Sequence, residues 1–216
     1  MSIDAENLAT RLGEAISSTP GAGADAMGWL WPVLLRELAR GRPVTVEDLA
    51  RVTGRGVTEV RDGLGGLSDT EYDETGAVLG HGITLRETPH RFTVDRQVLY
   101  TWCALDTLIF PTVLDRPAQV VSPTPGTGEP VALSVDPVAG VTALEPATAV
   151  VSVLVPDGGS GVRAAFCDQV HFFATLAAAH GWLAEHPGGT VLSVADAFEL
   201  GRRLAHDLVA SQPRCC

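Results

Sequence analysis

The sequence predicts an α+β fold. A winged-helix-like module of three helices comes first, followed by a domain of antiparallel β-sheets with flanking helices. Helical patterns open the chain, short alternating apolar segments separated by turns fill its middle, and helical patterns return at its end. Hydrophobic residues make up 45% and charged residues 19%, as in a globular chain with a substantial core. We place the N-terminal module at residues 1–95 and the second domain at residues 96–216.

The N-terminal module begins with a series of helical patterns. Apolar residues recur about every four positions from Ile3 onward, which predicts a short amphipathic helix. The apolar segment WPVLLRELARG predicts a second helix that begins at Pro32 and ends at Gly41. In TVEDLARVTG, Thr45 is the expected N-cap, because Asp48 follows at the capping-box spacing. GVTEVRDGLGGL predicts another helix, which its glycines weaken.

Two or three strands around a turn at residues 74–76 follow, in EYDETGAVLGHGITLRE and HRFTV. Three helices and a β-hairpin are the order of a winged helix, which suggests DNA binding. However, the candidate recognition helix, residues 57–67, carries Glu59, Arg61 and Asp62 and therefore has no basic face. The net charge of -11 also opposes binding to phosphates. We expect a structural module and no nucleic-acid partner.

The second domain is expected to begin with a helix over residues 96–114, in which Cys103 and Asp106 share an apolar face. AQVVS, PVALSV, VTALEP and TAVVSVLVP predict four short strands of an antiparallel region. Cys167 is expected in a strand or at a strand edge. Two helices are expected at the end, over residues 176–186 and 194–210, the latter with Ser193 and Asp196 in capping positions.

The chain shows no targeting or membrane signal. Its N-terminus lacks the basic and apolar regions of a signal peptide, and its longest apolar run is too short and too polar to span a bilayer. We therefore expect a cytoplasmic protein without a membrane partner. Its four cysteines are then expected to be reduced thiols, and none has the CxxC spacing of a structural zinc site: Cys103, Cys167, Cys215 and Cys216.

Asp106 is the only charged residue between Gln97 and Leu114, and it stands three positions after Cys103. A carboxylate among apolar side chains must be hydrogen-bonded, paired with a cation or protonated. Because no Lys or Arg stands one helical turn away, a local ion pair is excluded. Burial is then expected to raise the pKa of Asp106 above about 3.9. Cys103 is either a small buried hydrophobe or a thiol that works beside this carboxyl.

Cys167, in AAFCDQVHFF, adds a second thiol if folding brings it to Cys103. Two thiolates are natural linear ligands for Cu(I) or Hg(II), whereas zinc takes four ligands or three and a water. From the residues alone, the chain is an enzyme that uses thiol and carboxyl chemistry or a non-catalytic soft-metal (Hg/Cu) binding protein. A metal-responsive winged-helix regulator is a further alternative, which the acidic charge opposes.

The segments LYTWCALDTLIFP and FCDQVHFFA resemble the active-site pair of the alkylmercury lyase (organomercurial lyase) family. LLRELARGRPV, EYD, GITLRET and TGEPV extend the resemblance over most of residues 28–210. It implies protonolysis of a carbon–mercury bond to give a hydrocarbon and Hg(II), an activity that detoxifies mercury. It also implies that Cys103 and Cys167 are the mercury-binding thiolates and that Asp106 is the proton-handling carboxyl. The implied fold is a winged-helix-like module joined to an α+β domain.

The resemblance implies an organomercurial substrate and no organic or metal cofactor, since mercury is substrate and product. Cytosolic low-molecular-weight thiols and a mercuric reductase are the implied acceptors of Hg(II). The C-terminal PRCC is an addition to the family pattern. Its vicinal Cys215 and Cys216 are similar to the terminal cysteine pair of mercuric reductases. We expect them either to pass Hg(II) on or to be incidental thiols of a tail.

Overall fold

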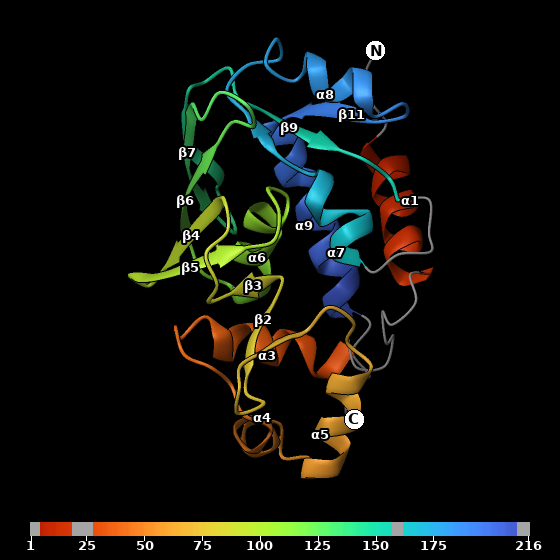
Figure 1. The fold of residues 1–216 in the computed structure, drawn as a ribbon, viewed down its shortest axis with the longest axis vertical. Helices are drawn as coiled ribbons and strands as arrows, with labels where there is room; N and C mark the ends of the chain where they lie inside the picture. The colour runs from red at the N-terminus through yellow and green to blue at the C-terminus, as the bar shows by residue number, and fades with distance from the viewer. Residues whose placement is uncertain (1–4, 19–27, 157–161, 211–216) are drawn as a thin grey trace.

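The computed structural model describes residues 5–18, 28–156 and 162–210, and it confirms the α+β class (Figure 1). One antiparallel sheet has eight strands in the order β1-β2-β3-β5-β4-β6-β7-β8, and a smaller sheet has the order β10-β9-β11. The strands of the larger sheet are β1 (Glu71–Tyr72), β2 (Val78–His81), β3 (Ile83–Thr84), β4 (His90–Val94), β5 (Gln97–Thr101), β6 (Ala118–Pro123), β7 (Pro130–Asp136) and β8 (Gly140–Glu145). Those of the smaller sheet are β9 (Val150–Val153), β10 (Phe172–Phe173) and β11 (Thr190–Ser193).

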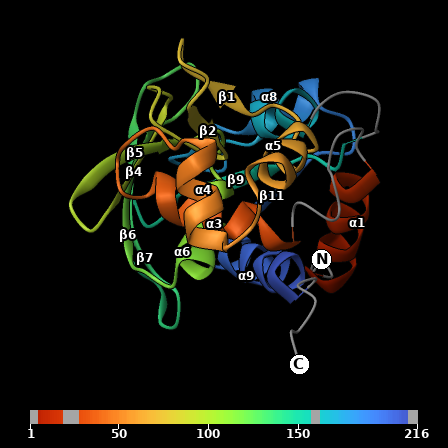
Figure 2. The same cartoon turned by 90° about the horizontal axis from the view of Figure 1, so that it is seen from below.

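The helices form two groups around these sheets. Figure 1 shows α3, α4 and α5 together at one end of the molecule, and Figure 2 shows α9 beside α1. Helix α6 packs against α9, which also contacts α1. None of the helices in the described ranges is both long enough and apolar enough to cross a membrane. Their bounds are α1 (Ala5–Ser18), α3 (Trp31–Leu38), α4 (Val46–Thr53), α5 (Val57–Gly65), α6 (Asp106–Leu114), α7 (Val162–Ala165), α8 (His180–Glu185) and α9 (Val194–Ala210).

The capping signals of the sequence are confirmed. The Thr45 hydroxyl accepts a hydrogen bond from the Asp48 backbone N–H at 3.1 Å, as the capping-box spacing predicts. At the start of α9, the Ser193 hydroxyl accepts from the Asp196 backbone N–H at 3.1 Å. Helices α3, α4 and α5 followed by the β1–β2 hairpin form the expected winged-helix-like module.

The predicted helix over residues 96–114 is wrong in its first half. Strand β5 occupies residues 97–101 and pairs with β4 through a tight turn at Asp95 and Arg96, whose φ angles are 48° and 68°. Helix α6 begins only at Asp106, so Cys103 lies in the turn before the helix and not on its face. The division of the chain at residues 95 and 96 stays a prediction, and it falls in the turn of the β4–β5 hairpin.

The segment around Cys167 also differs from the prediction. Cys167 begins a short 3-10 helix, Cys167–Gln169, which follows α7, and the strand β10 starts only at Phe172. The penultimate helix is shorter than expected, because turns occupy residues 175–179 before α8. The final helix, α9, has the predicted extent.

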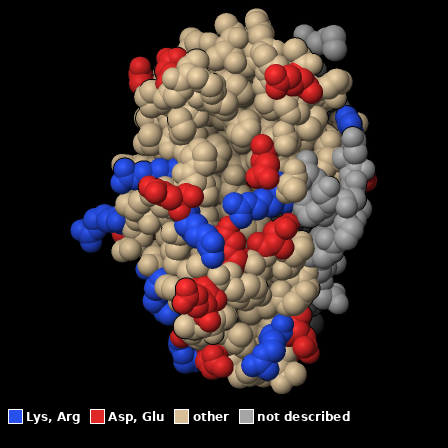
Figure 3. All heavy atoms as spheres, in the orientation of Figure 1, with Lys and Arg blue, Asp and Glu red and all other residues tan. Residues whose placement is uncertain are grey.

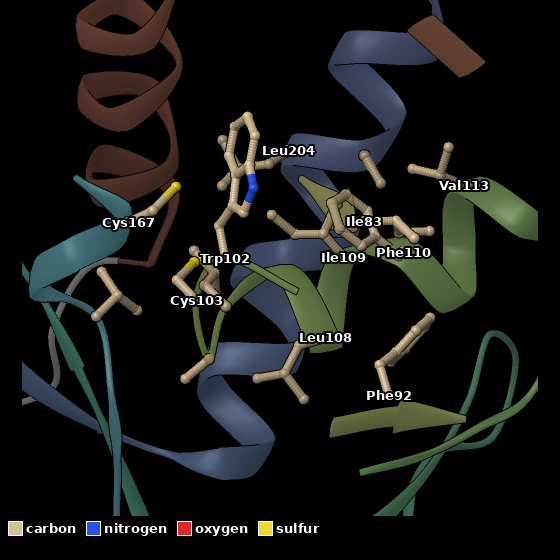
Figure 4. Close-up of a cluster of buried hydrophobic side chains, with 14 of the residues drawn as sticks. Ile83, Phe92, Trp102, Cys103, Leu108, Ile109, Phe110, Val113, Cys167 and Leu204 are labelled. Carbon is tan, nitrogen blue, oxygen red and sulfur yellow. The ribbon is translucent and has the colours of Figure 1, made fainter. Parts of the chain in front are cut away.

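Helix α6 lies in the centre of the core. Its Phe110 ring packs edge-on against Trp31 and Phe92, at centroid distances of 6.1 and 6.4 Å. Gly82 adopts φ +83°, and a Cβ there would lie 2.6 Å from the Phe110 ring. Gly201 on α9 lies close to Ile109, and a Cβ there would be 3.1 Å from the Ile109 side chain. Figure 4 shows this apolar cluster and, at its edge, Cys103 and Cys167.

Candidate active site

The turn between β5 and α6 is held by backbone hydrogen bonds on both sides. The Trp102 N–H donates to the Gly82 carbonyl at 3.0 Å, and the Ala104 N–H donates to the Val170 carbonyl at 3.1 Å. Between them, the Cys103 side chain is fully buried. The turn is therefore anchored to the N-terminal module through Gly82 and to the Cys167 segment through Val170.

Asp106 occupies the first position of α6, where the positive end of the helix dipole favours a carboxylate. Its Oδ2 accepts a hydrogen bond from the Cys103 backbone N–H at 3.1 Å. The carboxyl thus folds back over the turn and comes to lie beside the Cys103 thiol. Of the three states open to a buried carboxyl, namely hydrogen-bonded, paired with a cation or protonated, the structure shows the hydrogen-bonded one.

Cys103, Asp106 and Cys167 form one buried group, although Cys167 is distant in sequence. Their two sulfurs and one carboxylate oxygen all lie within 4.8 Å of one another. The two cysteines come from separate segments of the chain, with the Trp102 indole beside them (Figure 4). Both are free thiols and both are buried. The structure therefore brings together the three residues that the sequence could only suggest as a group.

Burial raises the pKa of Asp106 from its usual 3.8 to about 7. Hydrogen bonds from the Cys103 thiol and backbone, and the positive charge of Arg163, act in the opposite direction and keep the carboxyl partly ionised. Asp106 is therefore divided between its acid and its base form near neutral pH. A group in this state can accept a proton in one step and return it in the next.

Both thiols of the site are protonated near neutral pH. Burial raises the pKa of Cys103 well above its usual value, and the hydrogen bond with Cys167 and the Asp106 charge raise it further. The same hydrogen bond lowers the pKa of Cys167, but burial and the charges of Asp106 and Asp168 outweigh it, so the net change is upward. A soft electrophile that binds here must displace thiol protons, and Asp106 is the adjacent group that can accept one.

Two charged residues at the rim of the site were not predicted. Arg163, on α7, stacks its guanidinium over the Trp102 ring at 5.0 Å. Glu71, on β1, accepts a hydrogen bond from the Trp102 indole N–H at 3.0 Å and pairs with Arg163. No local pattern signals Glu71, because it reaches the site from a distant part of the chain. Arg163 stands four positions before Cys167, and this spacing could have suggested it.

Two other sequence expectations bear on the site. Cys215 and Cys216 lie outside the described residues. On the face shown in Figure 3, acidic and basic side chains are intermixed over the N-terminal module. Among the residues coloured on that face, no continuous basic surface appears.

Two family models match consecutive parts of the chain. Residues 7–82 match the model described as the helix-turn-helix domain of alkylmercury lyase. Residues 83–206 match the model described as alkylmercury lyase. Together they span both the winged-helix-like module and the buried cysteine–aspartate group.

Full-length relatives agree with the family models. An alkylmercury lyase of Streptomyces lividans is 55% identical to this chain, and the match covers 100% of both chains. One of Bacillus cereus is 48% identical over all of this chain and 99% of its own length. A solved structure of the mercury-bound form of MerB2 superposes with a TM-score of 0.74, covering 94% of this chain and 99% of that one. At 21% identity, this last likeness supports the fold.

Proposed function

Because this chain belongs to the alkylmercury lyase family, we propose that Cys103, Asp106 and Cys167 are the residues with which it cleaves its substrate. The chain is an organomercurial lyase, which breaks carbon–mercury bonds by protonolysis and releases a hydrocarbon and Hg(II). One observation carries the assignment of residues: two sulfurs and a carboxylate oxygen lie within 4.8 Å of one another in a buried site. A soft-metal binding protein needs the thiols, but it has no use for the proton-accepting Asp106.

Capture of the substrate requires the loss of a thiol proton. As the Cys103 sulfur bonds to the mercury of an organomercurial cation, the Asp106 carboxylate accepts the proton. The Cys167 thiol then adds as a second sulfur ligand and releases its proton to solvent. Two thiolates raise the electron density on mercury, and this makes the attached carbon more basic.

Cleavage returns the first proton to the carbon. Asp106 donates it as the carbon–mercury bond breaks, and the electron pair of that bond takes it up. The balance is one organomercurial cation and two thiols giving one hydrocarbon, one Hg(II) bound by two thiolates and one proton in solution. Mercury is substrate and product throughout, and we propose that no organic or metal cofactor takes part.

The product leaves by thiol exchange. Two cytosolic low-molecular-weight thiols replace the thiolates of Cys103 and Cys167 on Hg(II), directly or more rapidly by way of Cys215 and Cys216, which restores the protonated site. We propose that these thiols, and a mercuric reductase downstream, are the acceptors, and that the protein works in the cytoplasm, where such thiols are reduced.

The assay that tests the function is benzene release from phenylmercury in the presence of excess thiol. We expect one benzene per phenylmercury consumed and continued turnover while thiol remains. Stoichiometric binding of phenylmercury without benzene would instead identify a soft-metal binding protein and contradict the lyase.

The reaction is expected to depend on pH through Asp106. Only the ionised carboxyl can accept the thiol proton, and its pKa is about 7. The rate of capture should therefore rise with pH up to about 7 and level off above it. The rate at which phenylmercury binds to the protein without added thiol measures this, since no external thiol then titrates. A rate that falls as pH rises through 7 would contradict the assigned role.

Cys215 and Cys216 are proposed to receive Hg(II) from the buried thiolates and pass it to external thiols. Replacing both by serine is expected to slow Hg(II) transfer to external thiols severalfold. Single-turnover benzene release should not change, because the tail takes no part in breaking the bond. Equal transfer rates in the two proteins would show that the tail thiols are incidental.

A further inference from the structure

Glu71 is a nearly buried carboxylate of the N-terminal module that no step of the reaction uses. Its side chain is only 11% exposed, and all its partners lie on other elements. One oxygen, Oε1, accepts from the Trp102 indole at 3.0 Å and pairs with Arg163. The other, Oε2, accepts from the Thr84 hydroxyl at 2.5 Å and faces Arg86 at 3.8 Å.

These partners connect the two halves of the mercury site. Trp102 immediately precedes Cys103, and Arg163 lies one helical turn before Cys167. A single carboxylate therefore holds the residue next to the first thiol and the helix that leads to the second. The contact between Trp102 and Arg163, at 5.0 Å, closes this arrangement.

The surroundings of Glu71 fit a fixed position. On β2, a Cβ at Gly80 would lie 2.9 Å from the Glu71 Oε2 and 2.6 Å from the Thr84 Cβ, so only glycine leaves room for this pair. The His81 ring, also on β2, packs against the Trp102 ring at 5.2 Å. In this chain the β1–β2 hairpin, the wing of the module, thus contacts the turn that carries Cys103.

We propose that Glu71 is a positioning residue for carbon–mercury cleavage, which sets the separation of Cys103 and Cys167 by holding Trp102 and Arg163. This inference rests on the proposed roles of the two cysteines. Capture of the organomercurial needs one thiolate, whereas cleavage of the carbon–mercury bond needs both sulfurs and Asp106 at their correct separations. Loosening the Glu71 contacts should therefore lower kcat and leave KM nearly unchanged, because misplacement of reacting groups acts on the chemical step.

The test compares Glu71→Gln, Glu71→Ala and a control, Glu37→Gln. Glu71→Gln can still accept a hydrogen bond from the Trp102 indole, but it loses the ion pair with Arg163. Glu71→Ala loses both interactions. Glu37 is a matched control, since it is buried in the same module and pairs with Arg40 at 3.0 Å and with Arg42 at 3.5 Å, and none of these contacts involves a residue of the site. Thermal unfolding of each variant shows whether it is folded at the assay temperature.

Two readouts are measured. The first is the indole N–H resonance of Trp102, one of four tryptophans, identified by its absence in Trp102→Phe. We expect it to move in both Glu71 variants and to stay in place in Glu37→Gln. The second is phenylmercury turnover, for which we expect kcat about tenfold lower in Glu71→Gln, lower still in Glu71→Ala, and KM within about twofold.

The outcomes separate this proposal from the function itself. An unmoved indole resonance, or wild-type kcat in both folded Glu71 variants, overturns the positioning role. An equal loss of kcat in Glu37→Gln also overturns it, because the effect would then be a general one on the module. The indole resonance is read on the free protein, so it tests the contact even if phenylmercury is not cleaved. An inactive wild type overturns the proposed function instead, and a fully active Cys103→Ser overturns the proposed assignment of the site.

Discussion

Replacing Cys103 by serine is expected to abolish benzene release, with a loss on the order of 10³-fold or more, because a hydroxyl neither captures soft mercury nor ionises in this site. Cys167→Ser should behave differently. It keeps the first thiol, so it should still bind one phenylmercury, but cleavage should fall by a similar factor because the second sulfur donor is lost. The difference between capture and cleavage is what assigns separate roles to the two thiols.

Both variants are best made in a protein whose Cys215 and Cys216 are serine. The tail then binds no phenylmercury, and the stoichiometry reports on the buried site alone. This background protein is also the control, since it should cleave phenylmercury at the wild-type single-turnover rate. Full cleavage by Cys167→Ser would remove the second thiol from the mechanism, and full cleavage by Cys103→Ser would overturn the site assignment.

Much of the fold could be predicted because its signals are local. The Thr45 and Ser193 caps form the predicted hydrogen bonds, and the four predicted strands from residue 118 to residue 153 are present. Strand β5 was missed because QVLYTWCALDTLIF has apolar residues at both helical and strand spacings. Its hairpin turn was also hidden, since Asp95 and Arg96 adopt positive φ without the Asn-Gly or Gly-containing pair that usually signals it.

The site could be predicted only in part, because only some of its features have a local signal in the sequence. A lone Asp106 in an apolar stretch predicts a raised pKa, and burial does raise it to about 7. The pKa prediction holds although the predicted helix over residues 96–114 is wrong in its first half. It depends on desolvation of the carboxyl and not on the helix face that Asp106 occupies. The meeting of Cys103 with Cys167, and the contacts of Glu71 and Arg163, depend on tertiary structure that no local pattern encodes. The family resemblance supplied the pairing of the two thiols that spacing could not.

Asp106→Asn is expected to lower the rate of benzene release by about 10²- to 10⁴-fold, the usual contribution of a positioned proton donor and acceptor. The amide can still accept from the Cys103 backbone N–H, so the turn should keep its shape. It can neither take the thiol proton nor return it to carbon. Benzene release at the wild-type rate would show that another group handles the proton.

The same substitution is expected to stabilise the fold, and only at higher pH. The folded pKa of Asp106 is about 7 and the usual value is 3.8, so between these two pH values the folded protein binds more protons than the unfolded chain. The free energy of unfolding of the wild type must therefore fall as pH rises through this range. An amide does not titrate, so the advantage of Asp106→Asn should be small near pH 4 and reach the order of 4 kcal/mol above pH 7.

Urea unfolding of both proteins at about pH 4.5 and about pH 8 measures this difference. A pH-independent difference would mean that Asp106 keeps an ordinary pKa in the folded state, and the site would then lack a carboxyl that both accepts and donates a proton near neutrality. A gain in stability at pH 8 together with a loss of cleavage would show that the protein keeps a destabilising buried carboxyl because the reaction requires it.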